Sequence, residues 1–313
     1  MRISFVKGHM GGNTIVVLCG DEVPRETEIE VSLRAMGHTC VSGHEAGILY
    51  APEGHGDIKA KIVGFTSRRF ISACGGFTQV LGKALVEAGL AERFGIPVIE
   101  PVTKVHIETD AGLVEVAIEV SGGKAGKVTT DMGAFLSECY DLGVGPVRLP
   151  GVNAMRVGKF LVLNADEVRA ACQEADFDKM NTAALETLVR LQEGFKAITG
   201  QENLDFALYD WHPRQGGDLR AVYPHSIPSG HVEPACGTGT VAIGVACAES
   251  GEMDDRGVPD EGPAMLRFET GGGPNLAGPE VTELSMTLRR GRPVKARFSH
   301  SKVEVTADGR IWL

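Results

Sequence analysis

Residues 234–240, Pro-Ala-Cys-Gly-Thr-Gly-Thr, and residues 73–76, Ala-Cys-Gly-Gly, decide the fold of this chain. Each stretch follows strand-like sequence and leads into an apolar helix, and the two cysteines are 162 positions apart (236 − 74). The second helix, expected from about Thr240 to Glu249, has no polar face and should therefore be buried. A short buried helix among strands predicts a barrel or deeply curved sheet wrapped around it.

The rest of the chain is mostly strand-like, with a turn-rich segment near its middle. Leu113–Val120 alternates in the period-2 pattern of a half-buried strand. Glycines and prolines crowd residues 141–152, which indicates a domain boundary there. Further strands are expected at Ile3–Val6, Thr14–Cys19, Lys59–Phe65, Arg69–Ala73, Thr103–Thr109, Arg156–Leu163, Asp205–Tyr209, Leu219–Tyr223, Val281–Leu288, Lys295–Ser299, Val303–Thr306 and Ile311–Leu313. Further helices are expected at Phe77–Ala88, from about Asn164 to Ala175, and from about Asn181 to Ile198.

Length, charge and cysteine usage limit the classes of function. A chain of 313 residues is long enough for two ordinary domains. Its formal net charge of −10 argues against nucleic-acid binding, because phosphate contacts need a surplus of Lys and Arg. We expect no transmembrane helix and no export signal. The seven cysteines are odd in number and scattered, which favours free thiols in the cytoplasm over a disulfide framework.

Cys74 and Cys236 carry the chemistry that the sequence predicts. A cysteine at the last position before a helix faces free backbone N–H groups and the positive end of the helix dipole, and both favour the thiolate. The glycines that follow let an anion approach the backbone closely. Two such turns facing one α-carbon would remove a proton from one face and deliver a proton to the other, without a metal or cofactor.

The remaining cysteines and histidines have plainer interpretations. Four cysteines are expected to be small buried hydrophobic residues: Cys19, Cys139, Cys172 and Cys247. A histidine-rich region fits no zinc-binding spacing, so no metal site is expected among His38, Cys40, His44 and His55. The Gly-Thr-Gly-Thr run at 237–240 lacks the Gly-Lys-Ser/Thr ending of a phosphate-binding loop.

The motifs resemble those of the proline racemases and the diaminopimelate epimerases. The first cysteine motif, and Arg34-x-x-Gly37-His38 before it, are similar to proline racemases. The second cysteine motif resembles both families, and the N-terminal Lys7-x-His9-x-x-Gly12-Asn13 resembles diaminopimelate epimerases. The resemblance covers nearly the whole chain in order and spacing.

This resemblance implies an α/β (α+β) fold of two pseudo-symmetric domains, each a barrel-like curved sheet around a central helix, with the site in the cleft between them. The implied domains are residues 1–145, joined by C-terminal strands from about 290 to 313, and residues 146–289. Cys74 and Cys236 are then the two bases. The implied contacts to the substrate carboxylate are the backbone amides of Gly75, Gly76, Gly237 and Thr238, with Asn13 near the substrate.

The positions that would grip the distal part of the substrate differ from both families. Lys159 stands where diaminopimelate epimerases carry the Asn of a Gly-Asn-Pro-His motif, and Pro224-His225 falls where they carry Glu-Arg. Val232, with Glu233 beside it, replaces an Asp of the proline racemases. Lys159 either pairs with a carboxylate of an acidic substrate or is a solvated strand lysine. The sequence does not decide whether four other residues line the site: His38, His212, Arg214 and His225.

The sequence therefore predicts a cofactor-independent amino-acid racemase or epimerase whose substrate is neither proline nor diaminopimelate. Its expected partner is a small carboxylic acid, with no nucleic acid and no membrane, and a homodimer is compatible with the sequence. One alternative is an allylic isomerase of an unsaturated di- or tricarboxylate, as in the methylaconitate isomerases of the same superfamily. Another is a protein that binds a small acid without catalysis. The presence of both cysteines favours the racemase.

Overall fold

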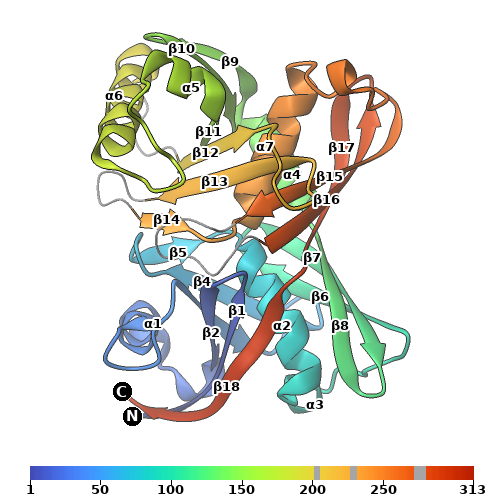
Figure 1. Ribbon diagram of the computed structural model, residues 1–313. Helices are drawn as coiled ribbons and strands as arrows, with labels where there is room; N and C mark the ends of the chain where they lie inside the picture. The colour runs from blue at the N-terminus through green and yellow to red at the C-terminus, as the bar shows by residue number, and fades with distance from the viewer. Residues whose placement is uncertain (201–204, 226–230, 271–279) are drawn as a thin grey trace. The chain divides into compact units, whose positions relative to one another are not determined.

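The computed structural model describes residues 1–200, 205–225, 231–270 and 280–313 (Figure 1). The chain divides into two compact units, here called domain 1 (residues 1–134 and 298–313) and domain 2 (residues 135–297). The sequence had placed these divisions at 145 and at about 290.

Domain 1 is a curved sheet with helix α2 packed against it. Two of its strand pairs, β2–β3 and β4–β6, are parallel. The pairs β18–β1, β1–β2, β3–β4, β6–β7 and β7–β8 are antiparallel. The strands are β1 (Arg2–Met10), β2 (Asn13–Cys19), β3 (Glu45–Tyr50), β4 (Ile58–Gly64), β5 (Arg69–Ile71), β6 (Val102–Thr109), β7 (Gly112–Ser121), β8 (Lys124–Asp131) and β18 (Val303–Trp312). The helices are α1 (Glu28–Met36), α2 (Gly75–Glu87) and α3 (Leu90–Arg93), with short 3₁₀ turns at Gly20–Glu22 and Arg25–Thr27.

Domain 2 repeats this order of strand directions around helix α7. The pairs β9–β10 and β10–β11 are antiparallel, β11–β12 parallel, β12–β13 antiparallel, β13–β15 parallel and β15–β16 antiparallel. Its strands are β9 (Val144–Leu149), β10 (Val152–Val157), β11 (Phe160–Asn164), β12 (Asp205–Asp210), β13 (Leu219–His225), β14 (His231–Glu233), β15 (Gly262–Thr270), β16 (Glu280–Arg289) and β17 (Arg292–His300), whose last residues belong to domain 1. Its helices are α4 (Gly133–Leu142), which begins in domain 1, α5 (Ala165–Ala171), α6 (Thr182–Thr199) and α7 (Gly237–Glu249), with a 3₁₀ turn at Asp254–Arg256. The expected fold class is confirmed: a mixed α/β structure built from curved sheets and a few helices.

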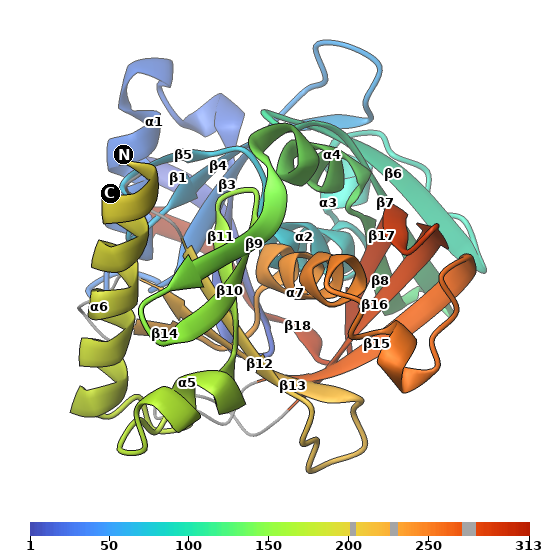
Figure 2. The same ribbon diagram turned by 90° about the horizontal axis from the view of Figure 1, so that it is seen from above.

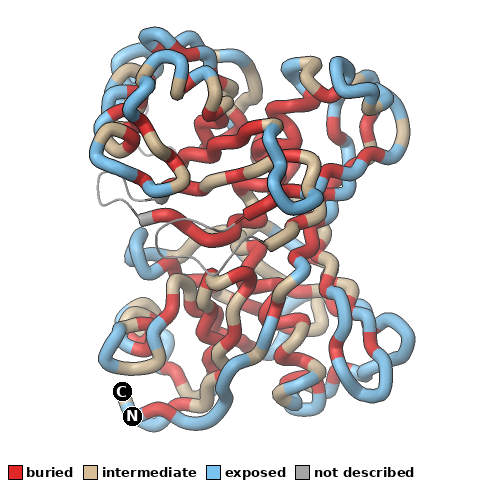
Figure 3. Tube along the Cα trace, in the orientation of Figure 1, coloured by how far each residue is buried: buried red, intermediate tan, exposed pale blue. Residues whose placement is uncertain are grey.

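The two central helices are buried because their sequences are apolar nearly all round. Figure 3 colours most of α7 as buried, and Val241, Ile243 and Val245 have no exposed surface. Close packing around these helices requires glycine at several positions, as two contacts illustrate. A Cβ on Gly244 of α7 would lie 2.3 Å from Leu284 Cδ2 of β16, and a Cβ on Gly47 of β3 would lie 1.9 Å from the ring of Phe77 in α2.

Other helices cover the outer faces of the sheets. In domain 2, Figure 2 shows α5 and α6 on one side of strands β10–β12 and α7 on the other. Alternation along β11 explains this layering: Leu161 and Leu163 pack into the α5–α6 core, which includes Leu188 and Phe195. In domain 1, Val31 and Ala35 of α1 join the core of strands β1–β4.

Three expected boundaries were wrong. Arg156–Leu163 is not one strand but the end of β10 and the start of β11, because Gly158 turns the chain at φ +59°. The two short strands expected at 303–306 and 311–313 are one continuous strand, β18, paired along β1. The helix after each cysteine starts at Gly75 and at Gly237, earlier than the expected ranges, and the cysteine is its N-cap, as its expected position before the helix had indicated.

A loop held by a buried or half-buried glutamate occurs once in each domain. In domain 1, the Glu108 carboxylate accepts hydrogen bonds from the backbone N–H groups of residues 53, 54 and 56, at 2.9, 2.7 and 2.9 Å. In domain 2, Glu269 accepts from the N–H groups of residues 214, 215 and 217. The two glutamates are 161 positions apart (269 − 108), as are their loop partners. The domains therefore share this detail as well as their strand order.

Candidate active site

Cys74 is the N-cap of α2 in domain 1. Its backbone is extended (φ −148°, ψ 114°), and its Sγ accepts a hydrogen bond from the Phe77 N–H at 3.3 Å. The Cys74 carbonyl accepts from the Thr78 N–H at 3.2 Å, which begins the helix. Since the sulfur takes the third amide of the helix, the amides of Gly75 and Gly76 keep no acceptor within the helix and can receive an anion.

Asn13 lies beside the first turn of α2. It is fully buried, and its Nδ2 is 3.4 Å from where a Cβ of residue 76 would be. Its Oδ1 lies 3.1 Å from Nδ1 of His44, and the same ring nitrogen accepts from the Thr14 N–H at 3.1 Å. The structure thus brings together four predicted residues of domain 1: Asn13, Cys74, Gly75 and Gly76. His44, which the sequence reasoning considered only as a poor metal ligand, lies beside Asn13.

Cys236 is the N-cap of α7 in domain 2 and has the same backbone shape (φ −132°, ψ 115°). Its Sγ accepts from the Gly239 N–H at 3.3 Å and lies 3.3 Å from the hydroxyl oxygen of Thr238. Its carbonyl accepts from both the N–H (3.0 Å) and the hydroxyl (2.6 Å) of Thr240. Cys236 is only 5% exposed, so these donors replace water around it.

Tyr223 of β13 supports this cap and was missed by the sequence reasoning. Its side chain is fully buried, and its hydroxyl lies 2.7 Å from Thr240 Oγ1. Burial raises the pKa of Tyr223 well above its ordinary value, so the phenol stays neutral. Its ring lies 2.6 Å from where a Cβ of residue 239 would be, which explains the second glycine of the motif. An aromatic residue in a strand gives no sequence signal for such a role.

Glu233 and Lys159, the predicted distal contacts, both belong to domain 2. Glu233 ends β14 three residues before Cys236 and is 8% exposed. Lys159 occupies the turn between β10 and β11, where its Nζ pairs with Glu138 Oε1 at 2.9 Å and its side chain is 41% exposed. An acidic substrate that binds Lys159 would compete with this carboxylate.

The chain was compared with known proteins, and no protein-family model matches it. An uncharacterized protein of Bacillus anthracis is 27% identical over 211 residues, which are 64% of this chain and 59% of that protein, so the match spans less than two thirds of the relative. Three solved structures each align with 99% of this chain. A methylitaconate-delta-isomerase has a TM-score of 0.65 and 18% identity, with 95% of that chain covered. A probable proline racemase of Agrobacterium radiobacter with bound carbonate has a TM-score of 0.65, 15% identity and 93% coverage, and a hydroxyproline epimerase of Agrobacterium vitis with bound trans-4-hydroxy-L-proline has a TM-score of 0.63, 14% identity and 92% coverage.

This chain has the proline racemase fold. The similarity predicted from the two cysteine motifs is confirmed at the level of the fold, over almost the full length of each neighbour. Within this proline racemase-like fold, each domain contributes one cysteine at the start of its central helix.

The other cysteines differ from the two helix caps, with one correction to the sequence interpretation. Burial raises the pKa of Cys139 to about 12 and also raises the pKa of Cys19 and Cys247, so these thiols stay protonated. Cys172 was expected to be a small buried hydrophobic residue and is only half-buried. Its contact with the Thr187 side chain lowers the pKa of Cys172.

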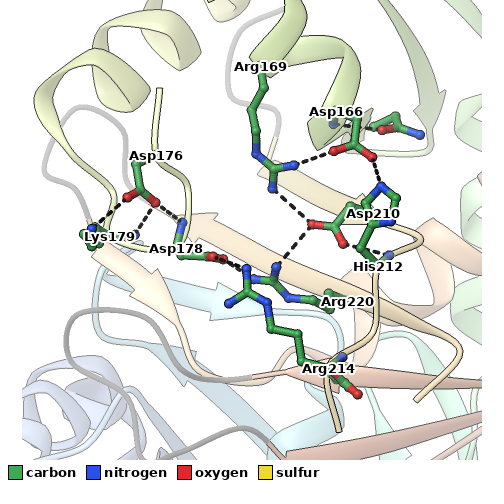
Figure 4. Close-up of polar contacts among 11 residues, drawn as sticks. Asp166, Arg169, Asp176, Asp178, Lys179, Asp210, His212, Arg214 and Arg220 are labelled. Atoms are coloured by element: carbon green, nitrogen blue, oxygen red, sulfur yellow. Dashed lines mark hydrogen bonds and ion pairs between the residues drawn. The ribbon is translucent and has the colours of Figure 1, made fainter. Parts of the chain in front are cut away.

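Most of the other residues whose place in the site the sequence did not decide are exposed on the surface. His38 is exposed. His212 and Arg214 belong to an ion-pair network in domain 2 (Figure 4), in which His212 Nε2 lies 3.0 Å from Asp166 and Arg214 lies 3.0 Å from Asp178. Buried Asp210 pairs in the same network with Arg169 (3.1 Å) and Arg220 (3.5 Å). The side chain of His225 lies outside the described part of the structure.

Residues 1–200, 205–225, 231–270 and 280–313 contain no group of three or more His, Cys, Asp or Glu side chains placed to hold a metal ion. Over the same ranges, no helix has both the length and the apolar character needed to cross a membrane.

Proposed function

We propose that this protein is a cofactor-independent isomerase that inverts the α-carbon of a small amino acid, with Cys74 and Cys236 as alternating acid and base. The observation that carries the proposal is the matched placement of the two thiols. Each caps its domain's central helix, with Sγ 3.3 Å from a first-turn N–H. Racemase and epimerase neighbours, one with bound hydroxyproline, support the reaction class.

In the proposed reaction, one cysteine thiolate takes the α-proton and the other cysteine delivers a proton to the opposite face. The carbanion is stabilised as an enediolate on the substrate carboxylate. The amides of Gly75, Gly76, Gly237 and Thr238 are the groups proposed to bind that carboxylate, because hydrogen bonds to developing negative charge strengthen in the transition state. Asn13 is proposed to contact the substrate amine or carboxylate beside α2.

We further propose that the substrate is neither proline nor diaminopimelate, and that Glu233 and Lys159 contact its distal part. Glu233 is buried close to Cys236 in sequence, and Lys159 is a partly exposed cation balanced by Glu138. The enzyme is proposed to work in the cytoplasm, where thiols remain reduced.

A second candidate is an allylic isomerase of an unsaturated dicarboxylate, which the methylitaconate-delta-isomerase neighbour favours. It would use the same thiol bases on a carbon next to a carboxylate. Nuclear magnetic resonance detects the shifted double bond of an allylic isomerase, whereas inversion of a single stereocentre leaves the spectrum unchanged and is detected by chiral chromatography.

The test is a panel of single-enantiomer amino acids and unsaturated diacids, with products resolved by chiral chromatography. We expect racemisation of at least one amino acid, reduced about a hundredfold or more in Cys74→Ser and in Cys236→Ser. Cys40→Ser, a half-buried thiol outside both helix caps, is the control and should keep the wild-type rate. Wild-type rates in both helix-cap variants would refute the proposal, and turnover of diacids alone would favour the second candidate.

A further inference from the structure

We propose that the hydroxyl of Thr238 donates a hydrogen bond to Cys236 Sγ and lowers the free energy needed to ionise Cys236. This inference rests on the proposed function, in which one thiol must be ionised and the other protonated before substrate binds. It assigns Thr238 a positioning role through its side chain, in addition to the proposed contact of its backbone amide with the substrate.

The contact is local and well defined. Thr238 is the second residue of α7, and its Oγ1 lies 3.3 Å from Cys236 Sγ. Next to a neutral thiol, the hydroxyl can donate or accept. Next to a thiolate it can only donate, because the sulfur carries no hydrogen. The bond is therefore stronger to the thiolate and lowers the cost of ionising Cys236.

Burial makes this donor necessary. Cys236 is 5% exposed, and removal from water by itself favours the neutral thiol. The Gly239 N–H, at 3.3 Å, supplies one hydrogen bond that replaces water, and the Thr238 hydroxyl is placed to supply a second. A buried thiolate that accepts two hydrogen bonds costs less free energy to form than one that accepts a single hydrogen bond.

Domain 1 has no such hydroxyl at the matching position. The two cysteines are 162 positions apart, and the residue 162 positions before Thr238 is Gly76 (238 − 76), which has no side chain. The Nδ2 of Asn13 would lie 3.4 Å from a Cβ at position 76. The hydroxyl donor at the second helical position is thus particular to Cys236, and the two caps are chemically unequal although their backbones match.

A lower free energy of ionisation raises the fraction of free enzyme in which the Cys236 sulfur is ready to accept an α-proton.

The test compares Thr238→Val, which keeps the shape but removes the hydroxyl, with Thr238→Ser, which keeps the hydroxyl. Alkylation by iodoacetamide is followed against pH without substrate, and mass spectrometry resolves each cysteine, so that alkylation of other thiols does not interfere. In Thr238→Val, the ionisation midpoint of Cys236 should rise by about one pH unit, which corresponds to roughly tenfold slower alkylation near neutral pH. The midpoint of Cys74 should stay unchanged, and Thr238→Ser should restore the wild-type Cys236 profile.

An unchanged Cys236 midpoint in Thr238→Val, or equal shifts of both cysteines, would overturn the inference. Circular dichroism of each variant checks that α7 is intact, and Thr238→Ala serves as the second variant if Thr238→Val does not fold. Because no substrate is present, failure of the proposed isomerase activity would leave this result readable on its own.

Discussion

At the residue scale, the two helix-cap cysteines are distinguished by their local donors. Each sulfur accepts a backbone N–H from its own helix, whereas burial keeps Cys139 and Cys247 protonated. The sequence could single out Cys74 and Cys236 because a Cys-Gly pair before an apolar helix is a local pattern. It could not find Tyr223 or His44, because their roles depend on contacts between residues distant in sequence.

His300 is a second residue whose state depends on distant contacts. It is 4% exposed, its Nδ1 accepts the Lys302 N–H at 3.0 Å, and its Nε2 is buried with no hydrogen-bond partner among the described residues. Burial lowers the pKa of His300 to about 4. Protonation is therefore easier in the unfolded chain, where the histidine pKa is about 6.5.

We predict that His300 makes the fold acid-sensitive. Between about pH 6.5 and pH 4 the unfolded chain binds the extra proton, so stability falls as pH falls, by about 3 kcal/mol at the lower end. Urea unfolding of His300→Asn at pH 7 and pH 4.5 should show a clearly smaller loss than wild type. Exposed His38→Asn is the control and should behave as wild type. A wild-type pH dependence in His300→Asn would exclude this origin.

At the element scale, the glutamate-held loop occurs in both domains, and the sequence contains this repeat although it was not predicted. Residues 52–60 and 213–221 share the pattern Pro-x-x-x-Gly-Asp-(Ile/Leu)-(Lys/Arg)-Ala, and both glutamates are followed by Thr. The two copies are 161 positions apart, close to the 162 positions between Cys74 and Cys236, so the repeat could have been predicted from the sequence. The hairpin at Gly158 could not be predicted in the same way, because the break in the strand depends on the backbone conformation of Gly158, whose φ is +59°.

Replacing Glu269 by Gln should destabilise the fold by about 1–3 kcal/mol, because the NH₂ group that replaces one carboxylate oxygen cannot accept hydrogen bonds from backbone N–H groups. Although burial opposes it, hydrogen bonds from the N–H groups of residues 214, 217 and 215 lower the pKa of Glu269. Its contribution is thus present above the unfolded pKa of about 4.3 and is lost as pH falls through the lower folded value.

The free energy of unfolding in urea at pH 7 measures this effect. Glu108→Gln is the matched control, since Glu108 makes the same three bonds in domain 1 with more solvent around it. The Glu108 variant should lose less stability than the Glu269 variant. Equal or reversed losses would contradict the dependence on burial.

At the scale of the whole molecule, both domains carry the same sequence of parallel and antiparallel strand pairs and the same capped central helix. The cysteine motifs predicted this repeat because a helix apolar all round must be enclosed by strands. The division of the chain at 134 and 297 was harder to predict, since it depends on which packed elements helix α4 and strand β17 join. The ion pair of Lys159 with Glu138 could not be predicted either, since no motif links these two residues.

The central claim, that two thiols act on opposite faces of one α-carbon, is tested most directly by isotope partitioning. A single enantiomer of an accepted amino acid is incubated in deuterium oxide, and substrate and product are analysed at early times. Two bases predict deuterium at the α-carbon of the product while the recovered substrate still carries hydrogen. Equal deuterium in both from the start would indicate a single base and contradict the account.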